Sequence, residues 1–326
     1  MRGSGRAGPA SVSEGGGLES VTLGGGGPRI SRVGFGCAGI AGHDYGPVDR
    51  DQAAAALRAA LDTGVTFVDV ANVYGLGRAE TIVGETIAAE EGVTVATKVG
   101  LCWDEGRRTW RDIRPEVIER SIEESLRRLR RDVLDVVQIH WPDGKTPVAD
   151  AVAALVRCRE RGKLRHIGVC NFTSCEVEKA AGVTQLVSLQ MPANLLQRGA
   201  FELLRRTHAA CGATPLCYNV LGQGLLAGGY NRSSRFEGTD VRQRSALFQE
   251  PTLSMAMALL DAMRPIALAR GVAVSQVAIR WLLDTLPGAC AIVGIKSAVQ
   301  ARENGNLISP LHPEERAEVD AVGVPA

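Results

Sequence analysis

Four side chains with acid–base chemistry stand at or just after the ends of short apolar runs. They are Asp69, Tyr74, Lys98 and His140. Tyrosine has an ordinary pKa of roughly 10, which is too high for a good proton donor near neutral pH, and a nearby ammonium lowers it. Lys98 fits that ammonium, Asp69 would hold it in place, and a neutral His140 would bind a carbonyl oxygen. Such a set could protonate an oxygen while hydride reaches the carbonyl carbon.

Each of these residues also has a purely structural interpretation. Asp69 could cap its loop, Tyr74 could pack beside it, and a lysine or histidine at a strand end is often solvated or hydrogen-bonded. A buried acid is costly unless it is paired. The recurrence of polar groups at successive strand ends therefore favours one functional site over four unrelated structural roles.

Eight short apolar runs predict the strands that must position these groups. They are Arg32–Cys37, Thr66–Val70, Val93–Val99, Leu134–His140, Leu164–Cys170, Leu186–Gln190, Thr214–Asn219 and Ala289–Val293. Alternation with helical patterns predicts a (β/α)8 TIM barrel in the α/β class, with a doubly wound open sheet as the alternative. Barrel enzymes carry their sites at the carboxyl ends of the strands, where the four candidates stand.

Helical periodicity fills the gaps between the strands. Asp49 with Gln52 indicates a helix start, and the helix extends to Leu61. The other expected helices are Ala79–Ala89, Pro115–Arg130, Val148–Arg161, Ser174–Ala181, Ala200–Cys211, Ser254–Ala269 and Ser297–Glu303, with Val274–Asp284 and Pro313–Val322 as extra C-terminal helices. Glycines 24–27 predict an N-terminal β-hairpin. The long irregular stretch Leu221–Pro251 is typical of a lid or binding loop.

Composition bounds the class of protein. Of 326 residues, 45% are hydrophobic and 22% charged, and the formal net charge is +1, which favours neither nucleic acid nor a membrane surface as partner. No apolar run approaches the ~20 residues of a membrane span. The eight cysteines show no metal-ligand spacing, so we expect a reducing, cytoplasmic location and no metal. Residues 1–19 are expected to be a disordered tail before a single domain, 20–326; the oligomeric state is not indicated.

Around the four residues the sequence resembles the aldo-keto reductase family, from about residue 20 to 308. The matching motifs are Asp69-x-Ala-x-x-Tyr74-Gly, the strand-end Lys98, and Gln138-Ile-His140-Trp-Pro-Asp143. The resemblance implies an NADPH-dependent oxidoreductase that reduces a small aldehyde or ketone to an alcohol, with Tyr74 as the proton donor. It also implies a set of cofactor-binding residues: Asn171, Gln190, Tyr218, Asn219, Leu221, Gly222, Gly224, Lys296, Ser297, Gln300, Glu303 and Asn304.

Two departures from the family pattern bear on the cofactor. Cys170 stands where the family usually has serine, and Ile295-Lys296-Ser297 supplies one cation where many members have two arginines. Lys296 near a helix start still suits the extra phosphate of NADPH, so NADPH is favoured over NADH. Gly34-x-Gly36-x-x-Gly39 matches a dinucleotide fingerprint, but no helix is expected after Gly39, so we reject that interpretation.

The substrate pocket is the least determined part of the site. Trp103 and Trp110 are expected on the loop after the third strand, and Trp141 follows His140; Trp103 and Trp141 are the predicted pocket residues. Two other functions stay open: a reductase dedicated to a keto-sugar or a secondary-metabolite intermediate, and a cofactor-binding regulatory subunit. The arginines of the stretch 232–244 could suit an anionic substrate or form a solvated charged loop.

Overall fold

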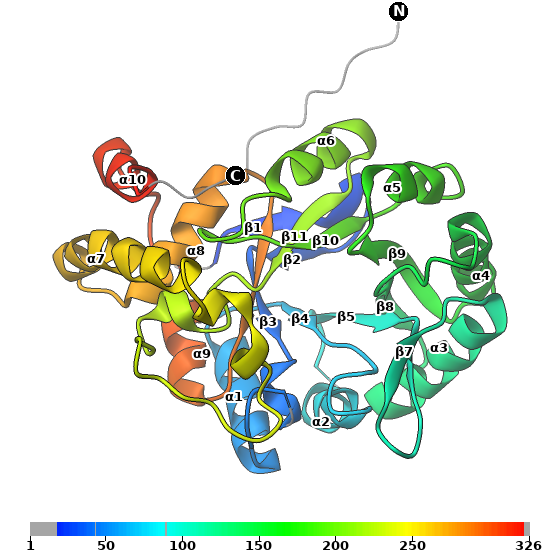
Figure 1. Ribbon diagram of the computed structural model, residues 1–326. Coiled ribbons are helices and arrows are strands. Elements are labelled where there is room, and N and C mark those ends of the chain that lie inside the picture. The colour runs from blue at the N-terminus through cyan, green and yellow to red at the C-terminus, as the bar shows by residue number, and fades with distance from the viewer. Residues whose placement is uncertain (1–17, 43, 89, 323–326) are drawn as a thin grey trace, which may run out of the picture.

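Eight parallel strands form a closed barrel at the centre of the molecule (Figure 1). The computed structural model describes residues 18–42, 44–88 and 90–322. The strands are β3 (Val33–Gly36), β4 (Phe67–Asp69), β5 (Thr94–Val99), β8 (Leu134–Ile139), β9 (Leu164–Cys170), β10 (Ser188–Pro192), β11 (Thr214–Tyr218) and β12 (Cys290–Gly294). Because β12 pairs with β3, the sheet has no free edge. The predicted barrel is confirmed, and the open sheet is excluded.

The barrel strands are covered on both faces, which is why their sequences are continuous apolar runs. Phe67, Val136 and Leu216 come from different strands and meet in one buried cluster inside the barrel. A second, larger cluster lies between the strands and the surrounding helices. The apolar layers hold the strand ends in place, and the functional side chains are attached to those ends.

The predicted N-terminal hairpin, β1 (Ser20–Thr22) and β2 (Arg29–Ser31), closes the bottom of the barrel. Its turn requires glycine at Gly24, which has φ 51° and lies so close to Val187 that a Cβ would stand 2.4 Å from that residue's Cα. The Gly24 amide also donates to Thr214 Oγ1 at 3.0 Å. Since Val187 and Thr214 lie at the amino ends of strands, the opposite end of the barrel is left open.

Helices surround the barrel as predicted. They are α1 (Arg50–Asp62), α2 (Arg78–Ile87), α3 (Pro115–Leu129), α4 (Val148–Glu160), α5 (Ser174–Ala181), α6 (Phe201–Cys211), α7 (Thr252–Arg270), α8 (Val274–Thr285), α9 (Ala298–Gly305) and α10 (Pro313–Asp320). Asp49 caps α1 by accepting from the Gln52 amide at 2.8 Å.

The last helices are layered differently from the prediction. The segment of α8 was expected to be an extra helix, but it packs against β12 and is buried along most of its length. The outer helix is α7, which packs on α8 and α10 (Figure 1). Within the described part of the chain, α7 is also the one helix with the length and mean hydropathy, 1.3, of a membrane span. Its packing against two other helices identifies it as a partly buried core helix.

The connection after β5 is not the plain loop that the sequence suggested. It forms an antiparallel hairpin of β6 (Leu101–Trp103) and β7 (Thr109–Arg111) at the barrel mouth. Trp103 and Trp110 therefore lie on strands. Arg107 occupies the hairpin turn with φ 64°. Each strand is only three residues long, which is too short for an alternating pattern to stand out in the sequence.

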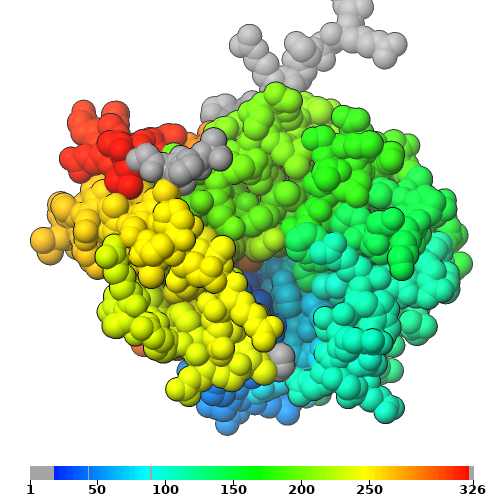
Figure 2. Space-filling view, in the orientation of Figure 1, coloured from blue at the N-terminus to red at the C-terminus, as the bar shows by residue number. Residues whose placement is uncertain are grey.

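The long stretch 221–251 crosses the mouth from the opposite side. It contains the short 3-10 helices η3 (Leu225–Ala227), η4 (Val241–Arg244) and η5 (Ala246–Phe248). The Val241 amide donates to the Asp44 carbonyl at 2.9 Å, which ties this stretch to the loop after β3. Figure 2 shows a hollow between this yellow loop and the blue and turquoise segments opposite it.

The expected tail, residues 1–19, lies almost entirely outside the described residues. Glu19, at its end, is described, and its carboxylate pairs with Arg32 at 2.6 Å and with Arg280 at 2.7 Å. These contacts join the N-terminal end of the described residues to α8.

Candidate active site

A buried ion pair lies at the mouth of the barrel. Lys98 Nζ on β5 is 2.6 Å from Asp69 Oδ1 on β4, and both side chains are at most 4% exposed. The ammonium also donates to the Val70 carbonyl at 3.1 Å. Burial lowers the pKa of Lys98, but the charge and hydrogen bond of Asp69, together with Tyr74 and Cys170, raise it, and the net effect holds this pKa above its ordinary value. The lysine is therefore an ammonium at every physiological pH.

Tyr74 completes this chain of contacts. Its hydroxyl lies 3.3 Å from Lys98 Nζ, and it is presented by a tight turn in which Gly75, at φ 60°, approaches Ala41 so closely that a side chain would clash. Burial raises the pKa of Tyr74 above its ordinary value, while Lys98 acts in the opposite direction. The expectation of a net lowering of the pKa is therefore wrong in this structure. The phenol keeps its proton, and the ammonium is placed to stabilise the phenolate left after the proton leaves.

His140 stands beside Tyr74 at the end of β8. The two rings meet edge to face, with centroids 5.9 Å apart and an interplanar angle of 83°. Burial, and then the positive charges of Lys98 and Arg111, hold the pKa of His140 well below its ordinary value, so the ring is neutral. Its Nδ1 has no hydrogen-bond partner among the described residues. This environment favours the expected neutral form of His140.

Two amides and a phenol, from three later strands or the residues just after them, extend the site. Gln190 Nε2 donates to Asp69 Oδ2 at 2.9 Å, so both oxygens of that carboxylate are engaged. Asn171 Nδ2 donates to the His140 carbonyl and to Cys170 Sγ, each at 3.1 Å. The Tyr218 hydroxyl donates to Asn171 Oδ1 at 2.8 Å. Predicted residues from β4, β5, β8, β9, β10 and β11 thus meet at one end of the barrel.

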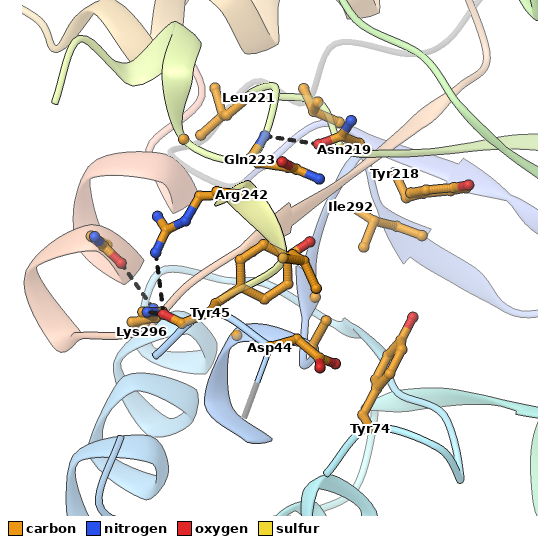
Figure 3. A pocket seen from close by; sticks show the side chains of 18 of the residues that line it. Asp44, Tyr45, Tyr74, Tyr218, Asn219, Leu221, Gln223, Arg242, Ile292 and Lys296 are labelled. Atoms are coloured by element: carbon orange, nitrogen blue, oxygen red, sulfur yellow. Dashed lines mark hydrogen bonds between the residues drawn. The ribbon is translucent and has the colours of Figure 1, made fainter. Parts of the chain in front are cut away.

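A cavity of about 360 Å³ runs from Tyr74 across the mouth to the start of α9 (Figure 3). Its lining contains half of the predicted cofactor-binding residues, namely Tyr218, Asn219, Leu221, Gly224, Lys296 and Gln300. The remainder, Asn171, Gln190, Gly222, Ser297, Glu303 and Asn304, are not in the lining. Ser297 instead caps α9 by accepting from the Gln300 amide at 3.3 Å, and Gln300 Oε1 accepts from the Lys296 amide at 2.8 Å.

The glycines after the first barrel strand line the same cavity. Gly36 and Gly39 are in its wall, and a Cβ on Gly39 would stand 3.3 Å from Lys296 Cγ. A 3-10 helix, η2 (Gly39–Ala41), follows them, and α1 begins only at Arg50. The rejection of the dinucleotide fingerprint is therefore confirmed.

Arg242 is the site residue that sequence reasoning placed wrongly, as part of a solvated loop. It is only 8% exposed and binds Asp240 through Nε at 2.8 Å and Nη2 at 2.5 Å. It also donates to the Tyr230 hydroxyl and, at 3.3 Å, to the Tyr45 carbonyl, which accepts from Lys296 Nζ as well. Figure 3 shows Arg242 and Lys296 meeting at Tyr45. In the sequence, only the aromatic residues of the long loop could have indicated that Arg242 is buried. In the structure these residues enclose its guanidinium.

The predicted pocket tryptophans lie outside the cavity wall. Trp141 is partly buried, and the guanidinium carbon of Arg111 lies 4.4 Å from the centroid of its ring. The guanidinium carbon of Arg128 lies 5.9 Å from the centroid of the Trp103 ring. Trp110 is 42% exposed. Phe236 and Phe248 pack on each other and on Tyr230, with centroids 4.8 to 5.6 Å apart. The two phenylalanines therefore pack within the long loop and hold it together.

The relationship to known proteins agrees with this geometry. The model of the Aldo/keto reductase family matches residues 32–323. The chain belongs to the aldo/keto reductase family, whose members are oxidoreductases. Aldo-keto reductase YhdN of Bacillus subtilis is 31% identical over 94% of this chain and 93% of its own length.

Two more family members are similar to this chain over most of their length. The aldo-keto reductase yakc [NADP(+)] of Schizosaccharomyces pombe is 29% identical over 86% of this chain and 84% of its own. The solved structure of the glycerol dehydrogenase AKR11B4 from Gluconobacter oxydans is 34% identical, covers 93% of this chain and 94% of its own, and superposes with a TM-score of 0.85.

Proposed function

We propose that this protein reduces an aldehyde or ketone to an alcohol with NADPH. The observation that carries the proposal is the buried Asp69–Lys98–Tyr74 chain at one end of an elongated cavity. A phenol beside a permanent ammonium is suited to give a proton to an oxygen that is gaining negative charge. Family membership supports the same reaction class.

The cavity fits a nicotinamide dinucleotide. Tyr218 and Asn219 lie near the catalytic end, where a nicotinamide ring would stack, and Lys296 stands at the far end, where it suits the extra phosphate of NADPH. Gln223 lines the cavity, and its Oε1 is buried without a partner among the described residues, so it can accept from a ligand N–H group. NADP is named for the yeast relative. When bound, the reduced cofactor supplies hydride to the carbonyl carbon.

The protein's own residues supply the other part of the reaction. The neutral His140 ring donates a hydrogen bond that orients the carbonyl oxygen beside Tyr74. The Tyr74 hydroxyl gives its proton to that oxygen as negative charge develops there. Lys98 stabilises the phenolate that remains, and Asp69, held by Gln190, keeps Lys98 in place. The proton on Tyr74 is replaced from solvent after the alcohol leaves.

The regulatory-subunit alternative differs in its prediction for turnover. The purified protein is incubated with NADPH or NADH and a panel of aldehydes and ketones, and both cofactor oxidation and alcohol formation are measured. We expect one alcohol formed per NADPH consumed, with NADH less effective. Tight NADPH binding without turnover of any carbonyl would contradict the proposal and favour the regulatory function.

A further inference from the structure

Arg111, at the end of β7, is an exposed cation beside the catalytic histidine. Its guanidinium lies over the indole of Trp141, 4.4 Å from the ring centroid, and Trp141 directly follows His140. In residues 18–42, 44–88 and 90–322, no carboxylate lies within ion-pair distance of Arg111. Two nearby arginines are paired instead, Arg108 on the hairpin with Asp104 at 3.3 Å and Arg114 after it with Asp112 at 2.7 Å, while Arg107 stands in the hairpin turn, at the opposite end of β7 from Arg111.

Hydrogen bonds anchor the hairpin on which Arg111 stands. The Ile113 amide donates to Asp143 Oδ2 at 3.1 Å, which ties the end of the hairpin to the segment that carries Trp141. Asp143 also accepts from the Thr146 amide at 2.7 Å and is thereby held in its own turn. At the base of the hairpin, Asn72 Nδ2 donates to the Leu101 carbonyl at 2.9 Å. Arg111 is therefore placed by the same framework that places the catalytic loop after β4.

The stacked geometry leaves the guanidinium available to a ligand. An arginine whose guanidinium lies over an indole has N–H donors left that can bind an oxyanion. Stacking also restricts the side chain beforehand, so less rotamer entropy is lost on binding. The positive charge of Arg111 reaches the active site, since it contributes to the lowered pKa of His140.

The arginines of the long loop are less suited to this role. Arg242 is committed to Asp240 at the Lys296 end of the cavity, and Arg232 pairs with Glu250 at 3.8 Å. In Figure 1 the hairpin that carries Arg111 stands across the mouth from that loop, on the side of β5 and β8. Arg111 does not line the cavity itself, but it lies over the residue that follows His140, on the catalytic side of the mouth.

We propose that Arg111, stacked on Trp141, binds an oxyanion of the substrate, so that the preferred substrate is a carbonyl compound carrying a carboxylate or a phosphate. The proposal rests on the proposed function, because it assigns the substrate class of the same site. It gives the β6–β7 hairpin a direct part in substrate selection. The hairpin contributes one charge, held against the residue that follows His140.

Matched pairs of substrates test the proposal. One pair is para-formylbenzoate and its neutral amide, and a second is phosphorylated glyceraldehyde and free glyceraldehyde. Loss of one charged hydrogen-bond donor in Arg111→Gln should lower kcat/KM for the favoured anion by about 10- to 100-fold, mainly through KM, with neutral partners changed by less than about 2-fold. Arg111→Lys should recover part of the loss. Arg108→Gln is the control, since that arginine already pairs with Asp104.

The results separate the subsite from the reaction. The pair that shows the larger loss identifies carboxylate or phosphate as the group. Equal losses on charged and neutral partners, or no loss on either, would overturn the proposal while leaving carbonyl reduction intact. If the wild-type protein turned over no carbonyl, the proposed function would fail separately. Calorimetric binding of para-hydroxymethylbenzoate against its amide to wild-type and Arg111→Gln protein would still measure the subsite, and equal affinities would contradict it.

Discussion

At the scale of single residues, the active site works through opposing influences on proton affinity. Burial makes the charged forms of Tyr74 and His140 unfavourable, so the phenol stays protonated and the imidazole stays neutral. Lys98 is equally buried, yet the Asp69 carboxylate keeps it charged. The site therefore holds the charged Lys98 beside the neutral phenol of Tyr74, and Tyr74 in turn lies beside the neutral ring of His140. That arrangement suits an oxygen that becomes negative only during the reaction.

The lowered pKa of His140 predicts a pH dependence of stability. Below about pH 6.5 histidines of the unfolded chain bind protons, while His140 in the folded protein remains neutral. The unfolded state then binds more protons, so folding stability falls as the pH falls below that value, by at most about 1.4 kcal/mol per pH unit for this one group. His140→Gln should remove that part of the loss. Urea unfolding of both proteins at several pH values measures it, and parallel stability profiles would contradict the assignment.

At the scale of elements, the two loops that flank the mouth have different tasks. The stretch 221–251 reaches the loop after β3 through Val241 and Asp44, and Arg242 and Lys296 share the Tyr45 carbonyl. These contacts bridge the cavity over its Lys296 end. The β6–β7 hairpin stands by the catalytic end and carries Arg111. Under the two proposals above, one loop retains the cofactor and the other selects the substrate.

Loosening the long loop should speed cofactor release. Arg242→Met removes the bonds to Asp240 and Tyr45, and we expect NADPH to dissociate about tenfold faster, because charged hydrogen bonds of this kind are lost. Stopped-flow fluorescence measures the rate. Arg235→Met, at an exposed position of the same loop, serves as the control and should leave the rate unchanged. If both variants released NADPH at the wild-type rate, the loop would have no part in retention.

At the scale of the whole molecule, the barrel separates stability from function. Its lower end is closed by the β1–β2 hairpin, and Glu19 joins that end to α8 through Arg32 and Arg280. The guanidinium-bearing side chains of Arg32 and Arg280 are only 5% and 2% exposed. All polar groups assigned to the reaction lie at the other end. The two ends can therefore be altered independently.

Glu19→Ala should destabilise the fold without a specific effect on catalysis. The substitution leaves two buried guanidinium groups without their shared carboxylate, and breaking such a pair costs about 3 kcal/mol. Glu202→Ala, which removes an exposed pair with Arg206, should cost less than about 0.5 kcal/mol. Denaturant unfolding gives both values. A loss for Glu19→Ala no larger than for the control would show that the N-terminal contact is not stabilising.

The sequence predicted the features that follow from long apolar periodicities. The eight strands, the helices and the strand-end positions of Asp69, Lys98 and His140 all depend on such patterns. It did not reveal the β6–β7 hairpin, whose strands are too short for a pattern, or the outer position of α7, because α7 and α8 are both apolar. The burial of Arg242 was missed because its partners, Tyr45 and Asp240, come together only through folding of the long loop.

Replacement of the phenol at position 74 tests the central claim most directly. Tyr74→Phe removes one oxygen, leaves the Lys98–Asp69 pair in place, and is measured by the rate of NADPH-dependent carbonyl reduction together with NADPH affinity. We predict that turnover falls at least about 100-fold, as expected for the loss of a general acid, while NADPH affinity is nearly unchanged. A variant that bound NADPH normally and kept more than about a tenth of the wild-type rate would contradict the assignment of Tyr74 as the proton donor.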